Sequence, residues 1–255
     1  MYGDMSGSLG WIGGLRGVGH LLRMTMESGK RVYNAFSIAP KPITVIVEGN
    51  IGSGKTTFLK HFQKLPDFAV VDEPISKWRD CQGHNLLELM YKDPQKWSLC
   101  FQSYVQLTML DLHVKPVLKP VKMMERSIFS AKYCFVKNLK DQGLMNDAEY
   151  TVLTEWFDFI QETIPLQVDL IVYLKTDPQV VFERIAARGR TEENSITLPY
   201  LQSIHKLHED WLIHKKFGPV PRVVTVDANE DLSKMMTSYS MCEETIIQKV
   251  AIANY

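Results

Sequence analysis

The chain has 255 residues, which is enough for one α/β domain of ordinary size or for two small domains. Lysine plus arginine and aspartate plus glutamate balance at 29 each, which argues against a general affinity for polymeric nucleic acid or for acidic membranes. No apolar run approaches the roughly 18 residues of a membrane-spanning helix, and the hydrophobic content of 45% supports a sizeable core.

Residues 1–42 differ in composition from the rest of the chain. They are rich in glycine, serine and methionine and carry mainly basic charges, at Arg16, Arg23, Lys30 and Arg31. This composition fits a disordered tail and an organelle-targeting segment about equally well. The four cysteines are widely spaced, which favours a reducing, intracellular compartment. We therefore expect a mitochondrial or cytoplasmic protein, with the mitochondrion slightly favoured, and a single domain over residues 43–255.

A phosphate-binding loop is the strongest motif in the sequence. Residues 43–47 are apolar and β-branched and predict a buried strand; a G-x-x-x-x-G-K-[ST] motif and a helix-compatible segment, residues 57–64, follow it. Glycines let backbone N–H groups point inward and form an anion-binding hollow at the N-terminus of the helix. The lysine of the motif reaches the β- and γ-phosphates, and its threonine offers a hydroxyl to Mg²⁺. We expect ATP to bind at Gly49, Asn50, Ile51, Gly52, Ser53, Gly54, Lys55, Thr56 and Thr57.

Two further predicted strands lead into acidic residues. Residues 68–71 precede Glu73, and residues 121–124 precede Glu125 and Arg126. The carboxyl ends of parallel strands meet at one edge of a sheet, so both carboxylates are expected beside the phosphate-binding loop. Glu125 occupies the usual place of a Mg²⁺-organising carboxylate, and Arg126 suits a clamp on a phosphate or on another carboxylate. The plainer alternatives are a solvated loop residue at Glu73 and a surface ion pair at Arg126.

Helical periodicity fills the intervals between the strands. The predicted helices cover residues 57–64, 85–91, 129–139, 147–163, 198–215 and 232–250, and two more open at Pro94 and Pro178. On the helix from Pro94, Gln102, Val105 and Met109 share one face. A glutamine between apolar residues is costly when it is buried without partners, so its amide meets either a backbone group or a ligand. Spacing alone does not decide between them.

The last two predicted strands, residues 170–174 and 223–226, complete an alternation of strands and helices. This alternation predicts an α/β protein with a P-loop kinase fold, in which helices cover both faces of a five-stranded parallel sheet. Arg184, Arg188 and Arg190 suit a mobile lid that neutralises phosphate charge during transfer, whereas a basic helix end would explain one arginine but not the cluster. The residues together indicate a Mg²⁺- and ATP-dependent phosphotransferase without naming its acceptor.

Several motifs in combination resemble the deoxyribonucleoside kinases. They are Glu48–Thr57, Glu73-Pro74 with Trp78, Leu89-Met90-Tyr91, Phe101–Tyr104, Glu125-Arg126-Ser127 and Arg188–Glu193. The resemblance runs from about residue 43 to residue 231 and looks closest to the insect multisubstrate and mitochondrial thymidine kinase branches. It implies phosphorylation of deoxyribonucleosides at the 5′-OH in nucleotide salvage, with nucleoside and ATP as substrates, Mg²⁺ as cofactor and a homodimer packed through helices. Residues after about 233 do not align clearly.

The resemblance also implies roles for individual residues. Glu73 matches the general base, Arg126 the residue that steadies it, and Lys55 the lysine of the phosphate-binding loop, while Thr56 and Glu125 match the residues that organise Mg²⁺. Gln102 matches the glutamine that reads the base, and its amide offers the donor and the acceptor that thymine or cytosine needs. Pyrimidines, thymidine and deoxycytidine included, are thus the expected acceptors, and purines stay open.

Further matches surround these residues. The lid matches Arg184, Arg188 and Arg190, and the loop that contacts adenine matches residues 227–232, with Glu230, Asp231 and Leu232. The nucleoside pocket matches Trp78, Met90, Tyr91, Val105, Met109, Ala131, Phe135 and Glu193. Within it Tyr91 and Glu193 match the pair that holds the sugar 3′-OH, and Phe135 matches the ring that stacks on the base.

Two other functions compete with this hypothesis. A nucleoside monophosphate kinase, such as a thymidylate kinase, shares the fold, but Glu73 at the acceptor 5′ position would repel a phosphate that is already present. A non-catalytic nucleotide-binding module is disfavoured because Lys55, Thr56, Glu73 and Arg126 occur together. Comparing thymidine with its monophosphate as acceptor distinguishes a deoxyribonucleoside kinase from a nucleoside monophosphate kinase.

Overall fold

The computed structural model describes residues 41–190, 193, 195–230 and 232–253. The segment Pro42–Tyr255 forms one compact unit. Residues 1–40 of the predicted tail or targeting segment, residues 1–42, lie outside the described residues, so that prediction stays open. Across the described ranges, no helix combines the length and the apolar character that crossing a membrane requires.

One parallel sheet organises the described residues. Its five strands lie in the order β2-β3-β1-β4-β5. They are β1 (Ile43–Glu48), β2 (Phe68–Val71), β3 (Val121–Glu125), β4 (Leu170–Lys175) and β5 (Val223–Asp227). Each strand predicted from the sequence is confirmed to within one residue at its ends. Because all five strands are parallel, the loops that follow them open at one edge of the sheet.

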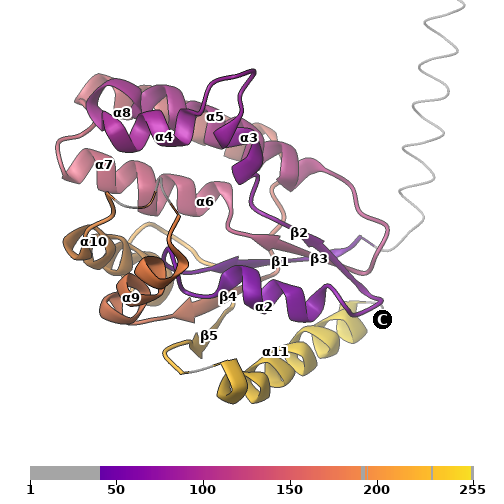
Figure 1. Cartoon of the computed structure of the whole chain (residues 1–255). Helices are drawn as coiled ribbons and strands as arrows, with labels where there is room; N and C mark the ends of the chain where they lie inside the picture. The colour runs from indigo at the N-terminus through magenta and orange to yellow at the C-terminus, as the bar shows by residue number, and fades with distance from the viewer. Residues whose placement is uncertain (1–40, 191–192, 194, 231, 254–255) are drawn as a thin grey trace, which may run out of the picture. The chain divides into compact units, whose positions relative to one another are not determined.

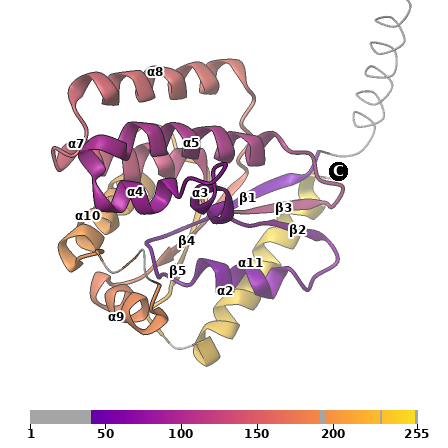
Figure 2. The ribbon, with the colours of Figure 1, turned by 45° about the horizontal axis from the view of Figure 1, so that its top comes forward.

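Side chains of β1 alternate between two cores. Val45 and Val47 face one side of the sheet, and Ile46 faces the other. The helices α2 (Lys55–Phe62) and α11 (Leu232–Ala253) cover the side of Val45, as Figures 1 and 2 show. The side of Ile46 carries α3 (Ile75–Arg79), α4 (Leu86–Lys92), α5 (Pro94–Val114), α6 (Ile128–Ser130) and α8 (Asp147–Thr163). Helices on both faces of a parallel sheet confirm the predicted fold class.

The predicted helices are present, but two of them contain π-helical turns that the sequence did not predict. The prediction for α8 is confirmed at both ends, and α9 (Pro178–Arg188) begins at its predicted proline. The predicted helix 129–139 is divided into α6, the π-helix η1 (Ala131–Val136) and α7 (Lys137–Asp141). The predicted helix 198–215 similarly changes from α10 (Leu198–His208) to the π-helix η3 (Glu209–Ile213). A π-helical turn inserts a residue without breaking the apolar face, so a period of 3.6 residues does not reveal it.

The C-terminal helix packs against the helix of the phosphate-binding loop. In both views α11 runs beside α2 (Figures 1 and 2). The rings of Phe58 on α2 and Tyr239 on α11 meet edge to face with centroids 4.8 Å apart, a favourable aromatic geometry. The end of the chain, for which the sequence predicts only a helix, thus supports α2.

Candidate active site

A cavity of about 780 Å³ lies beside the carboxyl ends of β1, β2 and β3. It is lined by the phosphate-binding loop, by Glu73 and Arg126, by side chains from α5 and by arginines of α9. The residues predicted from the sequence that line it are Ile51, Gly52, Ser53, Gly54, Lys55, Thr56, Thr57, Glu73, Trp78, Met90, Tyr91, Gln102, Val105, Met109, Glu125, Arg126, Ala131, Phe135, Arg184, Arg188, Arg190, Glu193 and Glu230. Asp231 and the side chain of Leu232 lie outside the described residues.

The phosphate-binding loop depends on glycine at its first position. Gly49 has φ +147°, and a Cβ atom there would lie 2.7 Å from both the Leu174 carbonyl oxygen and Ser53 Oγ. Lys55 Nζ folds back and donates to the carbonyl oxygens of Gly49, at 3.2 Å, and Asn50, at 2.8 Å. Gly49 and Asn50 therefore shape the loop and hold its lysine.

Lys55 carries a weakened positive charge in this arrangement. Burial, and after it the nearby Arg126 guanidinium, lower the pKa of Lys55 to about 7. An anionic phosphate brought into the loop would favour the charged ammonium again, because an opposite charge at short range stabilises it. The lysine is thus set to gain charge as a phosphate arrives.

Thr56 and Glu125 form an oxygen-rich pair beside the loop. Thr56 Oγ1 donates to Glu125 at 3.0 Å to Oε1 and 3.2 Å to Oε2. A hydroxyl and a carboxylate are ligands that Mg²⁺ prefers, and the ion is usually held by one or two carboxylates together with substrate phosphates. The pair has the chemistry of a site for a nucleotide-bound Mg²⁺.

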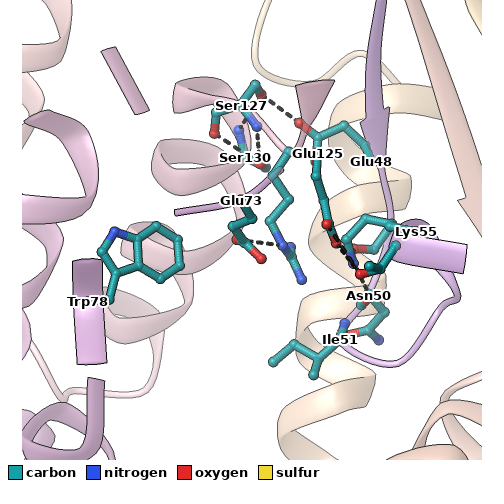
Figure 3. Close-up of polar contacts among 12 residues, drawn as sticks. Glu48, Asn50, Ile51, Lys55, Glu73, Trp78, Glu125, Ser127 and Ser130 are labelled. Atoms are coloured by element: carbon teal, nitrogen blue, oxygen red, sulfur yellow. Dashed lines mark hydrogen bonds and ion pairs between the residues drawn. The ribbon is translucent and has the colours of Figure 1, made fainter. Parts of the chain in front are cut away.

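Glu73 and Arg126 form a largely buried ion pair that also lines the cavity. Arg126 Nε lies 3.0 Å from Glu73 Oε1, and their side chains are only 7% and 11% exposed. Figure 3 shows Glu73 between Trp78 and Lys55. Burial raises the pKa of Glu73, and Arg126 opposes that rise. The alternatives of a solvated Glu73 and a surface ion pair at Arg126 are therefore wrong.

Arg126 itself sits in an unusual backbone conformation. Its φ is +60°, in the left-handed region that residues other than glycine seldom adopt, and its backbone N–H donates to the Val47 carbonyl oxygen at 3.0 Å. The guanidinium carbon lies 4.7 Å from the centre of the Phe135 ring. Its Nη1 atom is buried and finds no hydrogen-bond partner in the described part of the chain. A free donor inside a cavity is suited to an oxygen of a substrate.

The wall formed by α5 and α3 suits a flat, polar-edged ring. Gln102, Val105 and Met109 are buried on one face of α5 and line the cavity, as the spacing predicts. Gln102 Oε1 is buried, and nothing within the described ranges donates to it. Trp78 Nε1 donates to Thr108 Oγ1 at 2.9 Å, which fixes the indole. Of the two options that the sequence left open for Gln102, this oxygen favours a ligand.

The three predicted lid arginines have two different sets of partners. Arg188 Nη2 donates to both carboxylate oxygens of Glu193, at 2.7 and 2.6 Å, and Arg190 Nη1 lies 3.3 Å from the same carboxylate. Arg184 instead donates to the carbonyl oxygens of Ala228, Asn229 and Glu230. One arginine therefore joins α9 to the loop after β5, and two meet at Glu193.

The structure adds residues that the sequence reasoning did not assign to the site. Glu48 is completely buried at the end of β1 and accepts a hydrogen bond from Ser127 Oγ at 2.5 Å. Tyr200, whose pKa burial raises to about 12, lines the cavity with Tyr239 of α11. An acidic residue at a strand's end was a usable signal for Glu48, whereas the distant tyrosines carry no motif.

Comparison with known proteins agrees with this site. A family model described as deoxynucleoside kinase matches residues 45–252. The chain is 46% identical to human mitochondrial thymidine kinase 2 over 208 residues, which cover 81% of this chain and 78% of that protein. It is 33% identical to human deoxycytidine kinase over 250 residues, covering 86% and 93% of the two chains, and 35% identical to the mouse enzyme over 238 residues, covering 81% and 88%. With a phosphate-binding loop facing a carboxylate, these matches make the chain a member of the deoxynucleoside kinase family, a phosphotransferase that uses ATP.

Proposed function

We propose that this kinase prefers pyrimidine deoxyribonucleosides, thymidine and deoxycytidine included, and phosphorylates them at the 5′-OH for nucleotide salvage. The observation that carries the preference is Gln102, whose amide lies in an apolar wall with a buried oxygen that lacks a partner among the described residues. An amide presents a donor and an acceptor side by side, so it pairs with thymine in one orientation and with cytosine in the other. The relatives named for thymidine and for deoxycytidine support the same preference.

Glu73 acts as the general base in this proposal. It accepts the proton of the nucleoside 5′-OH while that oxygen attacks the γ-phosphorus of ATP, and a positioned base of this kind accelerates a reaction about 10²- to 10⁴-fold. Its raised pKa makes it a stronger base than a solvated glutamate. Arg126 holds the carboxylate through Nε, and its free Nη1 is available to the attacking oxygen.

Cationic groups of the phosphate-binding loop and of the proposed lid meet the triphosphate. Lys55 receives the β- and γ-phosphates, and Arg188 and Arg190 neutralise the transferred group, so that placement and charge account for most of the rate gain. Thr56 and Glu125 hold Mg²⁺, which when bound offsets charge on the phosphates. The loop of residues 227–232, which Arg184 joins to α9, receives the adenine.

The remaining cavity residues place the nucleoside. Tyr91 and Glu193 hold the sugar 3′-OH, and Phe135 stacks on the base, while Trp78 closes the pocket with Met90 and Val105. Met109 and Ala131 leave room for the thymine methyl group. All eight residues line the same cavity, which supports this assignment.

Phosphorylation of the four deoxyribonucleosides by the purified protein with ATP and Mg²⁺ tests the proposal. We expect thymidine and deoxycytidine to be good acceptors and thymidine monophosphate to be a poor one. The Glu73→Gln variant should lose about 10²- to 10⁴-fold in kcat at a KM for ATP close to that of the wild type. Negligible turnover of thymidine would contradict the pocket assignment, and full turnover by Glu73→Gln would remove the general base.

We further propose that the protein is a homodimer that packs through α5 and α8. Large apolar side chains on these two helices are half exposed or more: Leu107, Val114, Val152, Trp156 and Phe159. The three on α8 recur at spacings of four and three residues and so form one stripe. Figure 2 shows α8 alongside α5 as the outermost helix of that layer. A second copy would bury this apolar face.

Residues 1–42 are proposed to direct the protein to mitochondria. Their basic, acid-poor composition and the name of the human relative, mitochondrial thymidine kinase 2, support this. A fluorescent protein fused behind residues 1–42 should enter mitochondria, and one fused to residues 43–255 should not. A cytoplasmic distribution of the first fusion would contradict the proposal.

A further inference from the structure

Glu48 is a buried carboxylic acid for which the proposed chemistry has no use. It ends β1 on the side of Ile46, and none of its surface is exposed. Burying a carboxyl group is costly, and an apolar residue would suit this strand end better unless the acid has a task. Its neighbours are Ser127, Ser130, Cys134 and the charges of Arg126 and Lys55, and burial raises the pKa of Glu48 to about 7.

The contacts of Glu48 lead to the turn that carries Arg126. Ser127 Oγ donates to Glu48 Oε1 at 2.5 Å, while the backbone N–H of Arg126 donates to the carbonyl oxygen of Val47 at 3.0 Å. Two consecutive residues at the end of β1 therefore hold two consecutive residues of the turn. The turn needs such support because Arg126 has φ +60°, which costs conformational energy for any residue but glycine.

Ser127 passes this support to the next helix. Its Oγ accepts a hydrogen bond from the Ser130 backbone N–H at 3.2 Å, and Ser130 Oγ accepts one from the Ser127 backbone N–H at 3.3 Å. This reciprocal pair is a capping box at the start of α6. Because the hydroxyl proton goes to Glu48, the lone pairs of Ser127 stay free for the cap. Figure 3 shows the contact of Ser127 with Glu48 and the reciprocal contacts between Ser127 and Ser130.

We propose that Glu48 is a positioning residue: through Ser127 it holds Arg126 in the left-handed turn from which the guanidinium reaches Glu73. Glu48 does not touch the substrate; its effect on the reaction passes through the Arg126–Glu73 pair. Its carboxylate also places a second negative group beside the guanidinium, which helps to retain that charge in a buried site. The proposal rests on the proposed role of Glu73 as the base.

A double-mutant cycle tests whether Glu48 acts through Glu73. Glu48→Gln keeps an acceptor for Ser127 but removes the charge, and we expect it to lower kcat about tenfold while the KM values for ATP and thymidine change less than about twofold. In a Glu73→Gln background the same change should cost less than about twofold, because the pair it supports is already disabled. A purely structural role would lower kcat by the same factor in both backgrounds.

Two further variants keep the test decisive. Ser127→Ala breaks the same contact from the other side, and it replaces Glu48→Gln in the cycle if that variant does not fold. Asp169→Asn is the matched control: Asp169 Oδ2 accepts from the backbone N–H of Thr44 at 2.8 Å, at the far end of β1. The control should leave kcat unchanged in both backgrounds.

Each result separates this inference from the proposed function. Full kcat in both Glu48→Gln and Ser127→Ala, with Glu73→Gln impaired, overturns the role of Glu48 alone. Equal losses in the two backgrounds also overturn it. Full kcat in Glu73→Gln overturns the proposed base and with it the positioning role.

Discussion

Burial changes the proton affinity of ionisable side chains in and around the cavity. It raises the pKa of Glu48 to about 7 and that of Tyr200 to about 12, and it lowers the pKa of Lys55 to about 7. In each case water is withdrawn from the charged form; the Arg126 guanidinium opposes the resulting pKa shift at Glu48 and Tyr200 but adds to it at Lys55. Such shifts concentrate at functional sites, and here they surround the place where a proton and a phosphoryl group are proposed to move.

Gln102 offers a test at the scale of one side chain. Gln102→Leu should lower kcat/KM for thymidine about 10- to 100-fold. Leaving the polar edge of the base without a hydrogen-bond partner in a buried site costs about 1–3 kcal/mol. The KM for ATP should not change. Steady-state kinetics with thymidine and deoxycytidine give the measurement.

Gln106 is the matched control on the same helix. It is also buried, but its Nε2 donates to the Leu153 carbonyl oxygen at 3.1 Å. Gln106→Leu should therefore lower the melting temperature and leave the nucleoside KM unchanged. Equal effects of both variants on kcat/KM would contradict a base-reading role for Gln102.

Glu48 makes a prediction for stability as a function of pH. Its pKa is about 7 in the folded chain against a reference of 4.5, so its contribution to stability is present below pH 4.5 and is lost as the pH rises through 7. Glu48→Gln mimics the protonated acid. The difference in unfolding free energy between this variant and the wild type should therefore grow in favour of the variant by about 1–3 kcal/mol as the pH rises from 5 to 8.

Denaturant unfolding of both proteins at these two pH values gives the measurement. A stability difference that stays constant between pH 5 and pH 8 would show that Glu48 titrates normally. Higher stability together with lower turnover at pH 8 is the pattern expected of a residue kept for function.

At the scale of elements, short irregular segments supply several side chains of the site, and regular elements support these segments. The π-helix η1 supplies Ala131 and Phe135 to the cavity, and the five-residue helix α3 supplies Trp78. π-helical turns frequently occur at functional sites, because the inserted residue redirects side chains. The sheet and the long helices hold these segments in place.

The phosphate-binding loop gives a prediction at this scale. Gly49→Ala should abolish tight ATP binding, because the new Cβ would lie 2.7 Å from the Leu174 carbonyl oxygen, and a backbone atom of a buried strand cannot move aside cheaply. Isothermal titration with ATP and Mg²⁺ measures the loss.

Gly143→Ala is the control for backbone strain. Gly143 also has a positive φ, +67°, but a Cβ there meets no described atom within 4 Å. It should cost about 1 kcal/mol of stability with ATP affinity unchanged. Unchanged ATP affinity in Gly49→Ala would contradict the steric argument.

At the scale of the whole molecule, the cavity joins segments that lie far apart in the chain. The residues that line it run from Ile51, in the loop after the first strand, to Tyr239 of the last helix. The loops after parallel strands, which the sheet brings to one edge, supply part of the lining, and residues of helices such as α4, α5 and α11 supply the rest. The exposed apolar side chains of α5 and α8 do not line this cavity, and they form the surface that we propose for association with a second copy.

Dimer formation through that surface is testable. Trp156 is 58% exposed on α8, and Trp156→Glu should convert the proposed dimer to a monomer by placing a charge in an apolar interface. Met241→Glu is the control, since Met241 is 65% exposed on α11, on the other side of the sheet. Light scattering at several concentrations should show a monomer for the first variant and a dimer for the second. A wild type that is monomeric throughout would contradict the proposal.

The sequence by itself determined the fold class, the five strands and the kinase family. Apolar runs predict buried strands whatever surrounds them, and the phosphate-binding motif is a contiguous string whose geometry depends on local backbone freedom at positions such as Gly49. The edge at which Glu73 and Arg126 meet also followed from the sequence, because parallel strands share the direction of their carboxyl ends.

Only the tertiary structure decided how the site is supported. The hydrogen bond between Glu48 and Ser127 links residues 79 positions apart, and the contact of Arg184 with the loop after β5 spans 44. Likewise, the buried oxygen of Gln102 and the left-handed turn at Arg126 depend on which atoms of other elements come near. Such contacts leave no local periodicity or motif, because burial and pairing are properties of neighbours in space and not of neighbours in the chain.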